Sequence, residues 1–368
     1  MKPLGLMKIA ILGSCLAGMS LSLRLLKSQH EVSIWSPFPS LNSEGPGYLV
    51  NTVTLTSLKS LGLNIEPFEV PLYGGKAIDL FDSSTPHNSG LLFALDRNKL
   101  HQEFYRLLGA ERFHFDSHFS HFEPTLEYHA QRARFKDGRY TRADLFVGAD
   151  GTQSAVRKKH VAGPELSQSM TVQISGVSIV DPDSPLQKKV VKTFIDTKNE
   201  AEILTFPSTD SKCSWAIQFN ALHLLLENPD DDHQCHRLLN SFASDWPQEL
   251  RMLFAEGSIQ NLCYRKCSDR RLPHLFHKDN VILIGEAAHP TLPSLTTGTD
   301  SDLEDAMDLG DLITDYSRGY FPSIDVCLTE FTRQRRPVLG ARIRRARKDR
   351  DQFLSKCSAK SQPISSGR

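Results

Sequence analysis

VILIGEAAHPTLPSLTTGTDSDLEDA, residues 281–306, is the stretch that decides the fold. Its first four residues are β-branched or aliphatic, and such a short apolar run favours a parallel strand that is buried on both faces. Gly285 ends this strand, and Glu286 follows where an exposed carboxylate accepts hydrogen bonds from the hydroxyl groups of a ligand. Pro290 and Pro293 stiffen the next residues. The stretch therefore predicts a buried strand that leads into a stiff loop.

A helix is predicted after this loop, beginning near Thr299 or Asp300. Gly298 precedes it, and a helix N-terminus behind a glycine-containing loop offers unpaired N–H groups to an anion or an electron-rich ring edge. Acidic residues in the first turns suit the positive end of the helix dipole. These residues are Asp300, Asp302, Glu304 and Asp305.

The whole stretch resembles the second FAD-binding motif of the single-component flavoprotein monooxygenases, the family of p-hydroxybenzoate and salicylate hydroxylases. The family pattern Gly-Asp-Ala-Ala-His, a proline, Gly-x-Gly and Glu-Asp-Ala aligns here without a gap. Glu286 stands where the family has aspartate, and Thr296 stands where the first glycine is usual. The resemblance implies that Pro293 shapes the wall beside the oxygen site. It also implies that FAD is bound by Glu286, Gly298, Thr299 and Asp300.

A second glycine motif lies near the N-terminus, between predicted strands at 8–12 and 31–35. A strand, glycine turn, helix and strand within about thirty residues form a dinucleotide-binding βαβ unit. The turn residues predicted to bind FAD are Gly13, Ser14, Cys15, Leu16, Ala17 and Gly18. Cys15 occupies the middle glycine position, and Ser36 replaces the acidic residue expected after the second strand, where its hydroxyl still bonds a ribose. A purely structural βαβ unit is the alternative interpretation.

Two further segments resemble the family. Residues 144–157, DLFVGADGTQSAVR, match the Asp-Gly motif that serves FAD and reduced nicotinamide together, which assigns Asp150 and Gly151 to the cofactor. An apolar strand ends at residue 148, so Asp150 is placed at the carboxyl edge of the sheet, where open α/β sheets bind ligands. Arg97 opens a helix and resembles the arginine that reaches the FAD phosphates. An exposed arginine at a helix start is the alternative.

The predicted fold class is α/β: a Rossmann-like FAD-binding domain, a β-rich substrate domain laid over the flavin, and a C-terminal helix. The predicted ranges are 1–70, 91–165 and 270–322 for the FAD-binding domain, 71–90 and 166–269 for the substrate domain, 323–354 for the C-terminal helical region, and 355–368 for a disordered tail. The C-terminal helix is expected to be interrupted at Pro337 and Gly340. Its many arginines predict a solvated basic face or, alternatively, a contact with a membrane surface.

Composition excludes several classes of function. Lys and Arg total 43, as do Asp and Glu, so no global charge favours nucleic acid. No apolar run is long enough for a membrane helix. The seven cysteines are scattered and odd in number, which fits a reducing cytoplasm. The histidines at 114, 118 and 121 share no single strand face, so no metal site is predicted.

The resemblance implies an FAD-dependent monooxygenase. NADPH or NADH reduces the flavin, and one atom of O2 passes to a small, aromatic or heteroaromatic substrate. No residue is identified as a catalytic acid or base. Two alternatives stay open: an FAD protein that is reduced by a separate reductase or no longer oxygenates, and a flavin-free binding protein on the same fold. The substrate, the choice of nicotinamide and the oligomeric state do not follow from the sequence.

Overall fold

The computed structural model describes residues 5–41, 45–79, 85–124, 130–221, 232–255, 257–293 and 296–360. The strands are β1 (Lys8–Leu12), β2 (Glu31–Trp35), β3 (Tyr48–Asn51), β4 (Glu69–Asp79), β5 (Thr85–Leu95), β6 (Phe113–His114), β7 (Phe119–Pro124), β8 (Ala130–Phe135), β9 (Tyr140–Arg142), β10 (Leu145–Gly148), β11 (Thr171–Ile179), β12 (Val191–Asp196), β13 (Ala201–Pro207), β14 (Lys212–Asn220), β15 (Ile259–Cys267), β16 (His277–Lys278) and β17 (Val281–Leu283). The α-helices are α1 (Leu16–Lys27), α2 (Thr52–Ser60), α3 (Arg97–Leu108), α4 (Asp232–Ala243), α5 (Gln248–Arg251), α6 (Thr297–Ser317) and α7 (Ile324–Lys360).

A six-stranded sheet in the order β16-β17-β10-β1-β2-β6 forms one half of the molecule. Its four central strands are parallel, with Leu12 beside Gly148 and Gly148 beside Leu283. Parallel strands that are covered on both faces require the continuous apolar runs seen in these segments. Because of this register, the three chain segments that follow β1, β10 and β17 leave the sheet at the same edge.

Helix α1 packs directly against α6 over this sheet. Gly310 makes the close approach possible, because a Cβ there would lie 2.4 Å from Cγ of Arg24. The core beneath the helices is apolar and includes Ile11, Val147 and Ile282, each of which is fully buried. The glycine turn before α1 and the loop before α6 are therefore held over one sheet edge.

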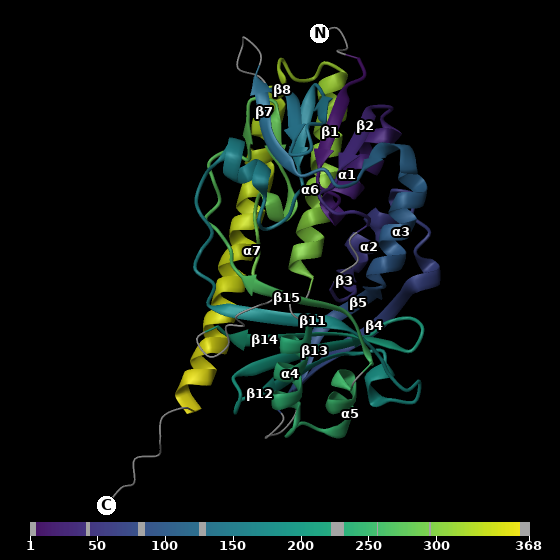
Figure 1. Cartoon of the computed structure of the whole chain (residues 1–368), viewed down its shortest axis with the longest axis vertical. Helices are drawn as coiled ribbons and strands as arrows, with labels where there is room; N and C mark the ends of the chain where they lie inside the picture. Colours follow the sequence, from purple (N-terminus) through teal and green to yellow (C-terminus); the bar gives the residue numbers. More distant parts are fainter. Residues whose placement is uncertain are drawn as a thin grey trace, which may run out of the picture.

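An eight-stranded sheet, β15-β11-β14-β13-β12-β4-β5-β3, forms the other half, below the first in Figure 1. Side chains alternate between its two faces. On β14, Trp215 and Ile217 enter an apolar core with Leu239 and Leu250 of α4 and α5. Ala216, between them in sequence, faces the other way, toward the six-stranded sheet. The predicted α/β fold with a second, β-rich part and a C-terminal helix is confirmed.

The sheet boundaries differ from the ranges predicted for the domains. Strand β3 pairs with β5 in the eight-stranded sheet, although residues 48–51 were assigned to the FAD-binding domain. Helix α2 begins directly after this strand, at Thr52, and the helix predicted near Thr299 begins at Thr297. Residues 48–51 form a strand because they pair with the distant strand β5. The local spacing of apolar residues does not predict such pairing.

Helix α7 corrects two predictions about the C-terminus. It runs without a break through Pro337 and Gly340 to Lys360, so residues 355–360 of the predicted disordered tail are helical. Residues 361–368 lie outside the described part of the chain. Its arginines are solvated only in part: Arg333 and Arg345 are 72% and 86% exposed, whereas Arg335 is 5% exposed and binds acids of α6. Other arginines pair with Glu330, Glu304 and Asp269; they are Arg333, Arg342 and Arg347.

Figure 1 shows α7 running along both halves of the molecule. Phe331 and Leu339 bury themselves in the core of the six-stranded half, which anchors the helix on both sides of Pro337. Packing and ion pairs at these positions outweigh the hydrogen bond that a proline removes from a helix interior. Within the described residues, no helix combines the length and the apolar character that crossing a membrane requires.

Candidate functional site: a cavity between the two sheets

A cavity of about 440 Å³ lies where the carboxyl edge of the six-stranded sheet meets the eight-stranded sheet. Most of the residues predicted to bind FAD line it: Gly13, Ser14, Cys15, Leu16, Arg97, Asp150, Gly151, Glu286, Gly298 and Thr299. Pro293, the predicted wall residue, also lines it. Ala17, Gly18, Ser36 and Asp300 lie outside its lining. Three segments that are far apart in the sequence therefore meet at one cavity.

The turn between β1 and α1 brings the backbone at Gly13 close to the backbone at Ala149. Gly13 has φ +120°, and a Cβ there would lie 2.0 Å from the carbonyl oxygen of Ala149. Only glycine fits this contact. Gly18, one turn into α1, lets the helix pack on the sheet, because a Cβ there would lie 3.0 Å from the Gly13 carbonyl oxygen. The turn thus aims the N-terminal N–H groups of α1 at the cavity.

Cys15 caps the N-terminus of α1 in an extended conformation. Burial raises the pKa of its thiol to about 12, so the side chain is a neutral group on the cavity wall. Ser36 is fully buried behind this turn, and its hydroxyl lies 2.9 Å from that of Ser14. The serine at the end of β2 therefore supports Ser14 and does not face the cavity.

Asp150 holds the start of the next helical turn. One of its carboxylate oxygens, Oδ2, accepts hydrogen bonds from the amides of Ala155 and Val156 at 2.7 and 3.1 Å. The other oxygen is buried without a partner among the described residues. Burial raises the pKa of this carboxyl group, although the capping bonds oppose the rise. Asp150 thus caps the helical turn with one carboxylate oxygen, and the side chain also lines the cavity.

Glu286 is one of the points where the two halves of the molecule touch. Its Oε2 accepts a hydrogen bond from Thr152 Oγ1 at 2.9 Å, and its Oε1 lies 3.6 Å from Arg265 Nη1 on β15. Arg157 ties the same turn to the segment after β10, since its Nη1 donates to the carbonyl of Ala287 at 2.7 Å. The segments 144–157 and 281–306 are therefore one hydrogen-bonded unit.

A buried ion cluster fixes the loop between β17 and α6. Asp305 Oδ2 accepts from the Gly285 amide at 2.9 Å and lies 2.5 Å from His289 Nε2. Its Oδ1 accepts from Arg335 Nε of α7 at 2.7 Å. Although burial alone raises it, the pKa of Asp305 is held below its ordinary value by His289 and Arg335. The histidine of the motif is thus structural and points away from the cavity.

The first turns of α6 separate the residues that were predicted together. Gly298 and Thr299 line the cavity. Asp300 faces away from it, accepting from Thr54 Oγ1 at 2.5 Å and from Asn51 Nδ2 at 2.9 Å, so it anchors the start of α2. Asp302 does line the cavity, although only its effect on the helix dipole was considered from the sequence. A carboxylate in a first helical turn is too common to be recognised as a site residue.

Asp302 is a second carboxyl group left without a partner. Its Oδ1 is buried and has no hydrogen bond among the described residues, and a Cβ on Gly285 would lie 2.8 Å from it. Burial and then the charges of Glu286 and Asp305 raise its pKa well above 3.8, and Arg97 opposes the shift only in part. Asp302 therefore keeps its proton to a higher pH than an exposed aspartate does.

Arg97 also lines the cavity. Its Nε donates to the Pro46 carbonyl at 2.8 Å and its Nη1 to the Tyr48 hydroxyl at 2.8 Å. The guanidinium also lies 4.1 Å from the centre of the Tyr48 ring. Arg97 therefore joins the loop after residue 44 to α3 and faces the cavity, so it is not an ordinary exposed helix-start arginine.

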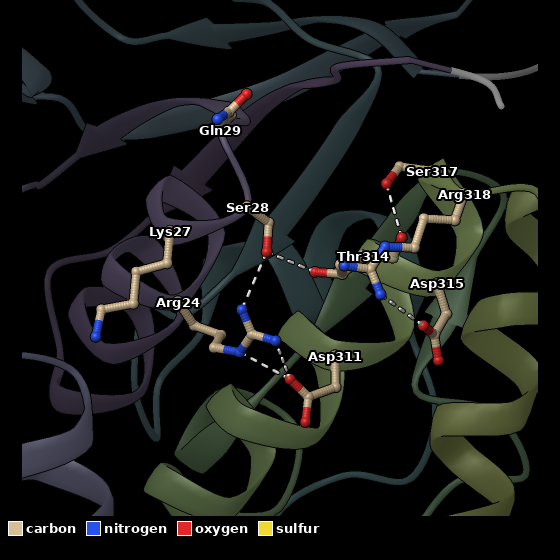
Figure 2. A pocket seen from close by; sticks show the side chains of 9 residues that line it. All are labelled: Arg24, Lys27, Ser28, Gln29, Asp311, Thr314, Asp315, Ser317 and Arg318. Carbon is tan, nitrogen blue, oxygen red and sulfur yellow. Dashed lines mark hydrogen bonds and ion pairs between the residues drawn. The ribbon is translucent and has the colours of Figure 1, made fainter.

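A wider surface cavity, of about 610 Å³, lies between the ends of α1 and α6 (Figure 2). Its polar and charged side chains bind one another. Arg24 Nε donates to Asp311 at 2.7 Å, and Ser28 and Thr314 share a hydrogen bond of 2.8 Å. It contains none of the predicted cofactor residues. Among the described residues, no group of three histidine, cysteine or acidic side chains is arranged to hold a metal ion.

The cavity between the sheets has the features that FAD requires. N–H groups at the start of α1 and α6 suit an anionic diphosphate or ring edge. At Gly298 a Cβ would meet only Thr291 Oγ1, at 3.5 Å, so this backbone is accessible to a large ligand. The unpartnered oxygens of Asp150 and Asp302 are polar groups that a bound hydroxyl or amide satisfies. The residues present therefore fit FAD.

Comparisons with known proteins agree with this assignment. A family model described as "FAD binding domain" matches residues 106–346, well over half of the chain. The 3-amino-4-hydroxybenzoate 2-monooxygenase of Streptomyces cremeus is 24% identical over 328 residues, which cover 82% of this chain and 77% of the relative. The 2,6-dihydroxypyridine 3-monooxygenase of Paenarthrobacter nicotinovorans is 23% identical over 339 residues, covering 83% of each.

Among solved structures, Klebsiella pneumoniae HpxO complexed with FAD and uric acid superposes with a TM-score of 0.79. The identity is 19%, and the match covers 96% of this chain and 91% of that one. A likeness at this identity concerns the fold. With the family match over residues 106–346 and the three motifs around one cavity, the chain belongs to the FAD-binding domain family of flavoprotein monooxygenases, and its cofactor is FAD.

Proposed function

We propose that this protein is a monooxygenase that uses NADPH or NADH and O2 to hydroxylate a small aromatic or heteroaromatic substrate. One observation carries the proposal: the cavity lined by the FAD motifs is also lined by the face of the eight-stranded sheet. Cofactor and substrate would therefore share one enclosed space. The relatives from S. cremeus and P. nicotinovorans, both named as monooxygenases of small aromatic compounds, support the same conclusion.

Bound FAD supplies the redox chemistry, taking electrons from the nicotinamide and activating O2. The chain supplies binding and orientation. The turn at Gly13–Leu16 and the N-terminus of α1 would hold the diphosphate, with Arg97 facing the same space. Glu286 would accept hydrogen bonds from sugar or ribityl hydroxyls, and Gly298 and Thr299 would offer N–H groups to the electron-rich edge of the reduced ring.

Exclusion of water is the second task of the protein. Leu204 and Phe206 of β13 and Ala216 of β14 form an apolar part of the wall, and Leu292 and Pro293 close the side next to the cofactor loop. A dry wall lowers the local dielectric, which strengthens the interactions that orient the reactants. We also propose that the protein is cytoplasmic. The chain would be divided into a cofactor domain and a substrate domain.

The test combines a visible spectrum of the purified protein with NADPH and NADH oxidation in air, followed over a panel of phenols, aromatic acids and hydroxypyridines. We expect bound flavin and nicotinamide consumption that a subset of the panel stimulates, with a hydroxylated product detected by mass spectrometry. Bound flavin that neither nicotinamide reduces would replace this proposal with one in which a separate reductase supplies the electrons. No flavin after reconstitution with excess FAD would overturn the assignment itself.

A further inference from the structure

Asp302 is a polar side chain of the cofactor cavity to which the proposed function gives no role. It lies four residues after Gly298 in α6, so the two residues share one face of the helix, and both line the cavity. A Cβ on Gly285 would lie 2.8 Å from Asp302 Oδ1 and 3.0 Å from the Cβ of Ala17. The carboxyl group is therefore close both to the loop after β17 and to the first turn of α1.

The neighbours of Asp302 offer an ionised carboxylate little compensation. Its Oδ1 is buried and accepts no hydrogen bond from a described residue. Arg97 is the cation that favours the ionised form, but its guanidinium already donates to Pro46 and Tyr48. The other groups that interact with Asp302 are acids or buried neutral side chains: Glu286, Asp305, Cys15 and Tyr48. Ionisation of Asp302 therefore places a poorly compensated charge in an enclosed site.

Bound FAD makes this ionisation still less favourable. The diphosphate of FAD is anionic, and the N–H groups at the start of α1 suit such a group. Burial, followed by the charge of Asp302, raises the pKa of the Cys15 thiol to about 12, so an ionised Asp302 acts on this helix start. Two anions held close together in an enclosed site repel each other. A proton on the carboxyl group removes the repulsion and adds a hydrogen-bond donor.

We propose that FAD binds together with a proton at Asp302, and that the protonated carboxyl group donates a hydrogen bond to an oxygen of the diphosphate or the adjoining ribityl chain. The proton comes from the solvent, and no covalent bond of FAD changes. Asp302 is thus a further cofactor-binding residue. The proposal requires FAD as the cofactor, and it does not depend on the reductant or the substrate.

Uptake of a proton makes FAD affinity depend on pH with a definite sign. The affinity is fully present while Asp302 is protonated in the FAD-free protein, and it is lost as the pH rises above the pKa of that form. The loss ends only when the pH reaches the higher pKa of the complex. Between these two values, each pH unit lowers the affinity by up to about tenfold, because one proton accompanies each FAD.

Equilibrium dialysis of the FAD-loaded protein at a series of pH values tests this, since flavin absorbance on both sides of the membrane gives Kd. Asp302→Asn carries a permanent N–H donor and no charge, so we expect it to bind FAD at least as tightly as wild type at every pH. The ratio of the wild-type Kd to that of Asp302→Asn should grow with pH by up to about tenfold per unit. This ratio cancels the ionisation of FAD itself and of other residues.

Two further variants separate the hydrogen bond from the charge. Asp302→Ala loses both, so its affinity should lack the contribution of Asp302 to the pH dependence and be about fivefold or more below that of Asp302→Asn. Asp311→Asn is the matched control, because it removes an acid of the same helix whose side chain is 59% exposed and pairs with Arg24 at the surface. It should keep both the Kd and the pH dependence of wild type.

The inference is overturned if the ratio of Kd between wild type and Asp302→Asn stays constant over the pH range in which both are folded. It is also overturned if Asp302→Ala binds FAD as tightly as Asp302→Asn, since no hydrogen bond would then exist. Weaker FAD binding by Asp302→Asn at every pH would overturn it as well, because the carboxylate would then act as an ion.

The outcome is separable from that of the proposed function. A constant ratio would leave the monooxygenase standing, because neither nicotinamide nor substrate takes part in the dialysis. Bound flavin that neither nicotinamide reduces would contradict the monooxygenase and leave the role of Asp302 standing. Wild type without affinity for FAD would overturn the role of Asp302 together with the cofactor assignment.

Discussion

Asp302 shows how one side chain links the cofactor cavity to pH. Among the described residues, its Oδ1 has no hydrogen-bond partner, and burial together with the charges of Glu286 and Asp305 raises the pKa of this carboxyl group well above 3.8 in the folded protein. The folded state therefore binds this proton more tightly than the unfolded chain does. The stability that follows is fully present below about pH 3.8 and is lost as the pH rises toward the raised pKa.

Asp302→Asn should remove this dependence, because the amide imitates the protonated acid at every pH. We expect the Tm of the FAD-free variant to exceed that of wild type by a margin that grows as the pH rises above about 3.8, the ordinary pKa of an aspartate. Asp311→Asn is the control on the same helix, since its side chain is 59% exposed and pairs with Arg24 at the surface. A margin for Asp302→Asn that stays constant with pH would contradict the prediction.

Residues of this kind are hard to recognise from the sequence. Asp302 occurs in a run of acids at a helix start, where every one of them suits the dipole. The structure gives each acid a different role: Asp300 binds Asn51 and Thr54, and Asp305 binds His289 and Arg335. Spacing does not distinguish them, because the partners come from distant parts of the chain.

At the scale of elements, α6 and α7 are joined by the buried pair of Asp305 and Arg335. Both side chains are at most 5% exposed, and the carboxylate also holds the Gly285 amide and His289. Removing one partner of a buried pair leaves the other charge uncompensated, which costs about 3–5 kcal/mol.

Arg335→Leu should therefore lower the free energy of unfolding of the FAD-free protein by about 3–5 kcal/mol, measured by urea denaturation. FAD affinity should fall as well, because the loop between Gly285 and His289 loses its support. Arg333→Leu serves as the comparison: that side chain is 72% exposed, pairs with Glu330 at the surface, and should change stability by less than about 0.5 kcal/mol. Similar losses in the two variants would refute the role of the buried pair.

The elements that the sequence predicts well are those whose signals are local. The glycine turn at 13–18 and the strand-loop-helix at 281–306 were placed within two residues, because backbone close approach demands glycine and buried strands demand apolar runs. Helix α7 was predicted to break at Pro337, since a proline does weaken an isolated helix. Its continuity depends on Arg335 and Leu339, whose partners lie elsewhere in the chain.

At the scale of the whole molecule, the cofactor side of the cavity was predictable and the substrate side was not. Gly13, Asp150 and Glu286 belong to motifs with fixed spacing. Arg265 and Gln173 face the cavity only because β15 pairs with β11. Such pairing joins segments about ninety residues apart in the sequence. The periodicity of either strand does not predict which of its faces will line the cavity.

The distribution of arginines also bears on an open alternative, the contact of α7 with a membrane surface. The chain has no net charge, and arginines of α7 bind acids of the same molecule at 269, 304, 305 and 330. Paired cations attract an anionic surface weakly. We expect no binding to phosphatidylserine vesicles in a sedimentation assay at physiological salt. Binding that weakens with salt and disappears in an Arg344→Gln, Arg345→Gln variant would contradict this.

The carboxylate of Asp305 has a consequence for how the chain can be divided. It fastens the cofactor loop to Arg335, although α7 contributes no residue to the cavity lining among those described. A portable cofactor-binding module cut from this protein would therefore have to extend past residue 335 to keep its loop in shape. A truncation chosen by the motifs alone, ending after the acidic run near residue 306, would retain every recognisable FAD signature and lose the support for one of them.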